Sequence, residues 1–254
     1  MARRERKQLM AVLLLMLCAA SFPISSLADD AGLVLSAEAS HKIRKGLNAG
    51  IEAEFRSRND FRTADRVSFG ANISYKVLPW LKASAGYSLL IDNNHEEITF
   101  QDDGVTLNNW RPSYWGLRHR FNVSLTGSHK VQRVEVSLRE RWQYTYRPGK
   151  VIDNFDFDEV AWEDHDVRGK GKNVLRSRLQ LEWDIPRWKF DPFASVEFHT
   201  TRQLDKTRFV VGVDHTIKKT HQFKLYYRYQ AVNRHGDDDE SNIHALGLGY
   251  TYKF

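Results

Sequence analysis

The sequence predicts an all-β fold, namely a transmembrane up-and-down antiparallel β-barrel of about 10–12 strands with long outer loops and short periplasmic turns. Three observations indicate this fold. Apolar and polar residues alternate in repeated segments, the connections between these segments alternate between short and long, and the chain ends on an aromatic residue, Phe254. Because a strand points successive side chains to opposite faces, strict alternation gives each segment one apolar face and one polar face.

The first five expected strands are 33–43, 47–56, 67–77, 81–91 and 115–126. The first of them alternates weakly, and the other four alternate strictly. Their apolar faces are Leu47, Ala49, Ile51, Ala53 and Phe55; Val67, Phe69, Ala71, Ile73, Tyr75 and Val77; Leu81, Ala83, Ala85, Tyr87, Leu89 and Ile91; and Trp115, Leu117, His119, Phe121, Val123 and Leu125. These faces are expected to contact lipid.

The remaining expected strands are 133–146, 173–184, 189–200, 207–216, 222–231 and 243–254. Apolar and aromatic residues again take every second position, except that Glu140 falls on the apolar face of its segment. Single-chain bacterial barrels usually have an even number of strands. Segment 33–43 therefore lies in the lumen, packs as an extra strand, or is accompanied by a short strand that the alternation does not reveal.

The connections differ systematically in length. Those at 44–46, 78–80, 127–131, 185–188 and 217–221 are short, and those at 57–66, 92–114, 147–172, 201–206 and 233–241 tend to be long and polar. Outer-membrane barrels have this asymmetry, whereas a soluble β-sandwich gives no reason for it. Aromatic residues fall near both kinds of connection, for example Trp80 and Trp183 near the short ones and Trp115 and Trp142 near the long ones. Two aromatic belts are expected of a membrane-spanning barrel.

The first residues predict export. Basic residues at 3–7 precede an apolar run at 9–20 and the small residues of Ser26-Leu27-Ala28. This order is that of a secretory signal peptide. We therefore expect residues 1–28 to be a signal peptide that is cleaved after Ala28, and residues 29–254 to form the outer-membrane barrel domain.

Composition excludes several classes of protein. The only cysteine, Cys18, lies in the expected signal peptide, so the mature chain has neither disulfides nor zinc–thiolate sites. Residues 1–28 hold four of the 38 Lys and Arg and one of the 32 Asp and Glu, which leaves the mature chain near a net charge of +3. That charge is no signature of nucleic-acid binding. No later apolar run is long enough for a membrane-spanning helix.

Several motifs resemble those of a known family. The motifs are Ile51-Glu52-Ala53-Glu54-Phe55-Arg56, Leu138-Arg139-Glu140-Arg141-Trp142, Asp191-Pro192-Phe193 and Gly247-Leu248-Gly249-Tyr250. The chain resembles small Gram-negative outer-membrane β-barrels of a porin-like family that is described as a domain of unknown function. The resemblance implies that the terminal aromatic residues Tyr250, Tyr252 and Phe254 form the signal that the barrel-assembly machinery reads. The chain is also similar to small oligosaccharide-specific channels, which line their pores with arginines.

Charged side chains occupy the face opposite the lipid face. The candidate lumen-lining residues are Arg118, Arg120, Arg139, Arg141, Arg176, Arg178, Arg208, Arg228, Glu52, Glu54, Glu182 and Asp214. Glu135 and Glu197 also lie on this face. Guanidinium groups stay charged and bind carboxylate or phosphate through a planar fork, and rings of such residues in a pore select anions. The functional interpretation of this pattern is a narrow channel for small anionic solutes such as acidic sugars.

The alternative is a structural or surface-interaction barrel whose lumen is plugged by pairs of Arg and Glu, because barrels of this size have little free interior. In either case something must offset the arginines that lie two apart on the neighbouring strands 115–126, 133–146 and 173–184. The candidates for that role are Glu52, Glu54, Glu182 and Asp214, or a bound anion.

A lipid hydrolase in the barrel wall is a third hypothesis, and it needs a serine activated by a histidine. His199 falls on the lumen face, and His119 and His215 have no serine nearby in the sequence. We therefore expect no catalytic residues, no enzyme activity and no cofactor.

The acidic stretches 153–159 and 237–240 lack the ligand spacing of an EF-hand, so no metal site is expected. The expected partners are outer-membrane lipid and lipopolysaccharide, the barrel-assembly machinery and a small anionic solute, without nucleic acid. The expected location is the outer membrane of a Gram-negative bacterium.

Overall fold

The computed structural model describes residues 29–233 and 242–254. The expected signal peptide at 1–28 and the acidic stretch at 237–240 lie outside the described residues. Within the described ranges, no helix is long and apolar enough to cross a membrane. The strands are β1 (Asp30–Arg44), β2 (Leu47–Arg58), β3 (Thr63–Leu78), β4 (Leu81–Asn94), β5 (Glu97–Phe100), β6 (Leu107–Arg111), β7 (Tyr114–Val131), β8 (Val134–Arg147), β9 (Lys150–Asp156), β10 (Ala161–Val167), β11 (Lys170–Trp183), β12 (Asp191–Thr200), β13 (Leu204–Ile217), β14 (His221–Val232) and β15 (Ile243–Lys253).

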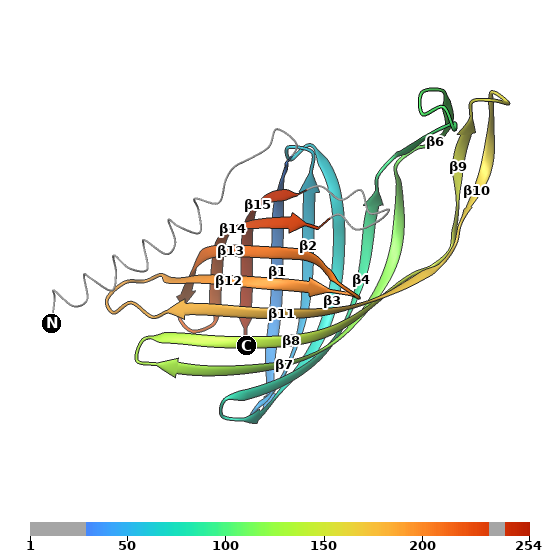
Figure 1. Ribbon diagram of the computed structural model, residues 1–254. Coiled ribbons are helices and arrows are strands. Elements are labelled where there is room, and N and C mark those ends of the chain that lie inside the picture. The colour runs from blue at the N-terminus through green and yellow to red at the C-terminus, as the bar shows by residue number, and fades with distance from the viewer. Residues whose placement is uncertain (1–28, 234–241) are drawn as a thin grey trace.

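Eleven of these strands close into a barrel in the order β1-β15-β14-β13-β12-β11-β8-β7-β4-β3-β2 (Figure 1). The predicted transmembrane barrel fold is confirmed, and each strongly alternating segment is one of its strands. Segment 33–43 belongs to β1 and is an extra strand of the wall. It pairs in parallel with β15, from Asp30 opposite Ile243 to Ser40 opposite Lys253, whereas it pairs antiparallel with β2. An odd number of up-and-down strands can close only if one neighbouring pair is parallel, and this pair is the seam between β1 and β15.

The alternation places apolar side chains outside and polar side chains inside. Ile51 of β2 is 65% exposed on the outer wall, whereas Ser124 of β7 is 1% exposed in the interior. Ala245 and Gly247 of β15 are buried on the lumen side, and Leu246 and Leu248 of the same strand are exposed outward. The predicted assignment of faces therefore holds from the first strands of the barrel to the last.

Several polar side chains on the outer wall contact a neighbouring strand or connection. Glu140 of β8 accepts a hydrogen bond of 2.6 Å from the hydroxyl of Ser177 on β11, which accounts for the carboxyl group on the apolar face. His119 lies 2.8 Å from the hydroxyl of Tyr87, and Nδ1 of His215 lies 2.5 Å from the carbonyl oxygen of Lys189. A polar group without a partner is costly in lipid, so these contacts stabilise the wall.

Two of the predicted long loops contain strands. Segments 92–114 and 147–172 hold β5, β6, β9 and β10, which form a sheet in the order β10-β9-β6-β5. We call this sheet the fin. Its strand order matches that of the barrel strands β11, β8, β7 and β4, to which its strands connect directly along the chain, and it projects beyond the outer end of the barrel (Figure 1).

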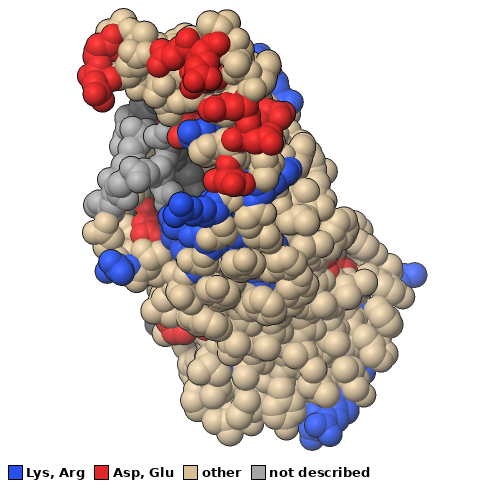
Figure 2. All heavy atoms as spheres, turned by 90° about the vertical axis from the view of Figure 1, so that its right-hand side faces the viewer, with Lys and Arg blue, Asp and Glu red and all other residues tan. Residues whose placement is uncertain are grey.

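The expectation of loops in these two segments was wrong for a physical reason. The strands are interrupted at 95–96, 112–113, 148–149 and 168–169, and Pro112, Pro148, Gly149 and Gly169 lie in the last three of these breaks. Beyond these breaks the fin carries polar residues on both faces, so it lacks the apolar alternation of a wall strand. Figure 2 shows Asp and Glu gathered at the top, over the fin, and Lys and Arg gathered below them.

The acidic stretch 153–159 shapes the turn that follows β9. The side chain of Asp156 accepts hydrogen bonds from the backbone N–H groups of Asp158 and Glu159, at 2.7 and 3.1 Å. Among the residues that the structure describes, no group of three or more His, Cys, Asp or Glu is placed to hold a metal ion.

Candidate functional site

The three arginine-bearing strands lie side by side, as predicted. β7 pairs with β8, and β8 pairs with β11. Their register places Arg139 directly opposite Arg178, and Arg141 directly opposite Arg176. Two pairs of like charges therefore face each other across one pair of strands, an arrangement that destabilises a sheet unless another group offsets it.

Glu197 of β12 is the group that offsets these charges. It is 3% exposed, and its carboxylate accepts hydrogen bonds from Arg139 and, at 2.5 Å, from Arg176. Nη1 of Arg208 lies 3.5 Å from the same carboxylate, and Nε2 of His199 lies 2.8 Å from it. A buried carboxylate is stabilised only by such pairing. We call these five residues the Glu197 cluster.

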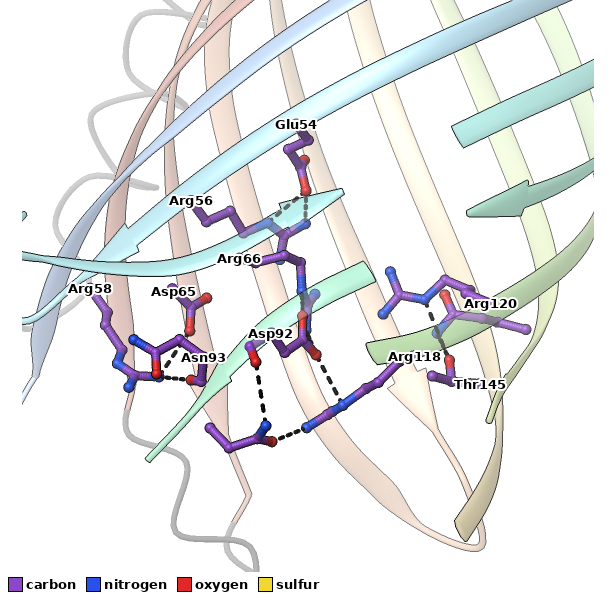
Figure 3. Close-up of polar contacts among 12 residues, drawn as sticks. Glu54, Arg56, Arg58, Asp65, Arg66, Asp92, Asn93, Arg118, Arg120 and Thr145 are labelled. Atoms are coloured by element: carbon purple, nitrogen blue, oxygen red, sulfur yellow. Dashed lines mark hydrogen bonds and ion pairs between the residues drawn. The ribbon is translucent and has the colours of Figure 1, made fainter. Parts of the chain in front are cut away.

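A second cluster lies near the outer end of β3, β4 and β7 (Figure 3). Asp92 binds Arg66 through both carboxylate oxygens, with one of the two hydrogen bonds 2.9 Å long. Nε of Arg118 lies 3.0 Å from Asp92, and Nη2 of Arg118 donates to the side-chain oxygen of Asn94 at 2.8 Å. Because the two arginines share one carboxylate, this Asp92 cluster carries net positive charge.

The candidate carboxylates of the sequence prediction lie elsewhere. Glu54 pairs with Arg56 at 2.7 Å, and Asp214 lies 3.6 Å from Lys224. Glu52 stands opposite Glu38, and Glu182 stands opposite Glu135. None of the four forms an ion pair with the arginines of β7, β8 and β11 within the described part of the chain.

Four candidate arginines have no carboxylate partner among the described residues. They are Arg120, Arg141, Arg178 and Arg228. Arg120 donates to the hydroxyl of Thr145 at 3.4 Å (Figure 3), and Arg141 donates to the hydroxyl of Ser124 at 2.9 Å. The Nε atoms of Arg178 and Arg228 are buried and have no hydrogen-bond partner. We call these four residues the unpaired arginines, and they leave the lumen with an excess of positive charge.

The sequence prediction missed the two carboxylates that organise the lumen. Asp92 and Arg66 were assigned to loops, because apolar alternation ends one residue before Asp92 and begins one residue after Arg66. Glu197 was placed on the correct face, but its central position depends on the register of β12. That register sets it opposite both Arg178 and Arg208. A carboxylate in the middle of the strand between two arginine-bearing strands was the signal available in the sequence.

Comparisons with known proteins agree with this architecture. The structure is similar to the β-domain of the Bordetella autotransporter BrkA, with a TM-score of 0.50, 11% identity, and 82% of each chain covered. It is also similar to the NanC porin, with a TM-score of 0.47, 13% identity, and coverage of 89% of this chain and 99% of the porin. At this identity, the likeness to the autotransporter domain supports the fold alone.

No curated protein sequence matches the chain. A family model does match it, over residues 32–242, and its description is "Protein of unknown function (DUF2490)". The resemblance that the strand motifs predicted is therefore confirmed. This sequence therefore folds into an outer-membrane type of barrel with an arginine-rich lumen. The chain belongs to the DUF2490 family.

Proposed function

We propose that this protein is an outer-membrane β-barrel that conducts small anionic solutes through a narrow lumen. The observation that carries the proposal is the set of unpaired arginines, Arg120, Arg141, Arg178 and Arg228, on the lumen face. Guanidinium groups keep their charge and offer a planar fork to carboxylate and phosphate. A passage lined by one sign of charge between walls of low dielectric constant concentrates ions of the opposite sign.

The paired arginines stand directly opposite two of the unpaired ones and add to the positive charge of this part of the wall. Glu197 fixes Arg139 and Arg176, and the register partners of these two residues are the unpaired Arg178 and Arg141. A lumen that served only as a packed core would be expected to pair every buried charge, because a buried unpaired ion is strongly destabilising. Unpaired guanidiniums instead require water or anions beside them.

Hydroxyl and amide groups stand next to the lumen arginines. The hydroxyl groups of Thr145 and Ser124 contact the unpaired Arg120 and Arg141. In the Glu197 cluster, Gln143 accepts a hydrogen bond from Arg176 at 3.0 Å, and Gln230 accepts one from Arg208 at 2.6 Å. Such neighbours can bind the hydroxyl groups of a solute whose acid group binds a guanidinium. We therefore propose acidic sugars as the solute class, and this assignment includes no catalytic step.

A structural barrel with a plugged lumen is the second candidate. Val34 of β1 and Leu90 of β4 are each 1% exposed although they lie on the lumen face, so part of the interior is packed with apolar side chains. A plugged barrel would show no steady single-channel current. An open one would show it.

Reversal potentials of the purified protein in planar bilayers, under a potassium chloride gradient, test the proposal. We expect chloride to be preferred over potassium. Replacing two unpaired arginines, Arg141→Gln with Arg178→Gln, should reduce that preference. Arg62→Gln is the matched control, because it removes one positive charge from the exposed turn between β2 and β3. Cation preference in the wild type, or equal effects of the control and the double variant, would overturn the anion channel.

The solute class has its own test. Glucuronate added to the outer side should block the chloride current, whereas glucose at the same concentration should not. Equal block by both compounds would show that the acid group is not recognised.

The location and the processing of the chain are part of the same proposal. The barrel fold and the apolar outer wall support a place in the outer membrane of a Gram-negative bacterium, in contact with lipid and lipopolysaccharide. We propose that residues 1–28 are removed on export, that residues 29–254 form the mature domain, and that the barrel-assembly machinery inserts it. N-terminal sequencing of protein from outer-membrane fractions checks the cleavage site, which we expect after Ala28.

A further inference from the structure

A cavity of about 290 Å³ lies where the barrel wall passes into the fin. The side chains that matter for its chemistry are Asn94, Tyr114 and Arg147 from the barrel rim and Arg111, Ile152 and His165 from the fin. The volume is at the lower end of the range for small-molecule sites. The interruptions at 95–96, 112–113, 148–149 and 168–169 separate the two sets of residues along the chain, so the cavity lies at the junction that these interruptions create.

The cavity lies on the face of the wall that lines the lumen. Asn94 and Tyr114 are register partners at the outer ends of β4 and β7. Asn94 accepts the hydrogen bond from Arg118, which belongs to the Asp92 cluster, and donates to the carbonyl oxygen of Tyr114 at 3.2 Å. On β8, Arg147 occupies the same face as Arg139 and Arg141, two-residue steps further along. The cavity therefore lies at the outer rim of the barrel, on the same face of the wall as the lumen arginines.

Two arginines and one carboxylate, Glu97, line this cavity, so its lining carries a small excess of positive charge. Nε of Arg147 is buried without a hydrogen-bond partner, and its Nη2 donates only a long hydrogen bond of 3.3 Å, to the carbonyl oxygen of Arg168. Arg111 is held in place by Glu97, at 2.8 Å. Lys150 does not line the cavity but lies near it, because its ammonium group is 5.4 Å from the centre of the Tyr114 ring and donates to the carbonyl oxygen of Trp115 at 2.7 Å.

The cavity also offers surface for an organic group. Ile152 is 8% exposed and stands opposite His165 in the fin, and Tyr114 lines the cavity from the barrel rim. A site that combines a partly unsatisfied arginine with a tyrosine and two aliphatic side chains, Ile152 and Val167, suits a ligand with one acid group and a compact body.

We propose that this cavity binds a small organic anion at the outer mouth of the barrel. Its carboxylate or phosphate pairs with Arg147, and its body packs between Tyr114 and Ile152. The inference rests on the proposed function in one respect, namely that the bound anion is the solute that next meets Arg118 and the lumen. The binding itself can be measured without any conduction.

Isothermal titration calorimetry of the full chain in detergent tests the site. The probes are benzoate, phenyl phosphate and the neutral benzamide. We expect saturable binding of benzoate or phenyl phosphate at one site per chain. Benzamide should bind at least about tenfold more weakly, because it lacks the charge that pairs with Arg147. The stronger of the two acids identifies whether carboxylate or phosphate is the preferred group.

Two variants locate the binding. Arg147→Gln removes the charge, and Val167→Trp fills the cavity from the fin. Each should weaken binding about tenfold or more, while Arg62→Gln leaves it unchanged. If Arg147→Gln fails to fold, as judged by its migration with and without heating, Val167→Trp decides alone. Absence of saturable binding of both acids, or unchanged affinity in the folded variants, overturns the site.

The proposed binding site and the proposed channel can be disproved independently of each other. Binding of the acids that is lost in Val167→Trp, together with a wild-type current that shows no anion preference, leaves the site and removes the channel. Anion preference without any binding of the acids leaves the channel and removes the site.

Discussion

Glu197→Gln is expected to be among the most destabilising conservative substitutions in the barrel. The amide keeps the size of the side chain and one acceptor oxygen, but it removes the charge that Arg139, Arg176 and Arg208 share. Removing one partner of a buried ion pair costs about 3–5 kcal/mol. We expect the upper half of that range, because Arg139 and Arg176 each stand opposite a further arginine, and no other carboxylate of the described residues pairs with them.

The assay is urea unfolding of the protein folded into lipid vesicles, followed by tryptophan fluorescence and by the change in gel migration on heating. Glu182→Gln is the matched control. It makes the same chemical change on the same face of neighbouring β11, at a carboxylate that stands opposite Glu135 and forms no ion pair within the described part of the chain. The control should change the free energy of unfolding by less than about 0.5 kcal/mol or stabilise the barrel slightly.

High salt gives a second measurement on the same variant. At molar chloride, anions screen the arginines and can occupy the space beside them, so part of the stability that Glu197→Gln loses should return. The reasoning is refuted if Glu197→Gln unfolds at the same urea concentration as Glu182→Gln, or if salt leaves the difference between them unchanged.

Two further predictions concern the last strand. A Cβ atom at Gly247 would overlap the ring of Tyr226, so Gly247→Ala should destabilise the barrel by about 1–3 kcal/mol in the same urea assay. Adding Tyr226→Ala should remove the clash, and a Gly247→Ala variant as stable as the wild type would contradict this. Phe254 closes the seam, because its N–H donates to Ser40 at 3.0 Å and its carbonyl oxygen accepts from the N–H of Lys42 at 3.3 Å. Deleting Phe254 should reduce the amount of protein in outer-membrane fractions, and normal insertion would show that Tyr250 and Tyr252 suffice as the assembly signal.

The wall of the barrel could be predicted because its cause is local. A period of two in the sequence is the period of a strand, and burial against lipid makes one face apolar along the whole segment. Ile51 and Leu248 were placed on the outer wall for that reason, and both are exposed there. The adjacency of β7, β8 and β11 followed from an up-and-down topology, and with it the crowding of Arg139, Arg141, Arg176 and Arg178.

What could not be predicted depends on register between strands and on the ends of strands. The sequence does not show that Glu197 stands opposite Arg178 on one side and Arg208 on the other, because that depends on how β12 shifts against its neighbours. The parallel seam joins β1 and β15 from opposite ends of the chain, so no local pattern reveals it. The sequence prediction left Asp92 out of its strand, because strands continue beyond the lipid, where neither face needs to be apolar.

Anomalous X-ray diffraction from crystals grown in bromide tests the central claim most directly, because bromide reports where the lumen holds an anion. The account predicts a bromide peak in the interior within hydrogen-bond distance of Arg178 or Arg228, and loss of that peak in Arg178→Gln with Arg228→Gln. Bromide found only outside the barrel, with the four unpaired arginines enclosed by protein atoms, would contradict it.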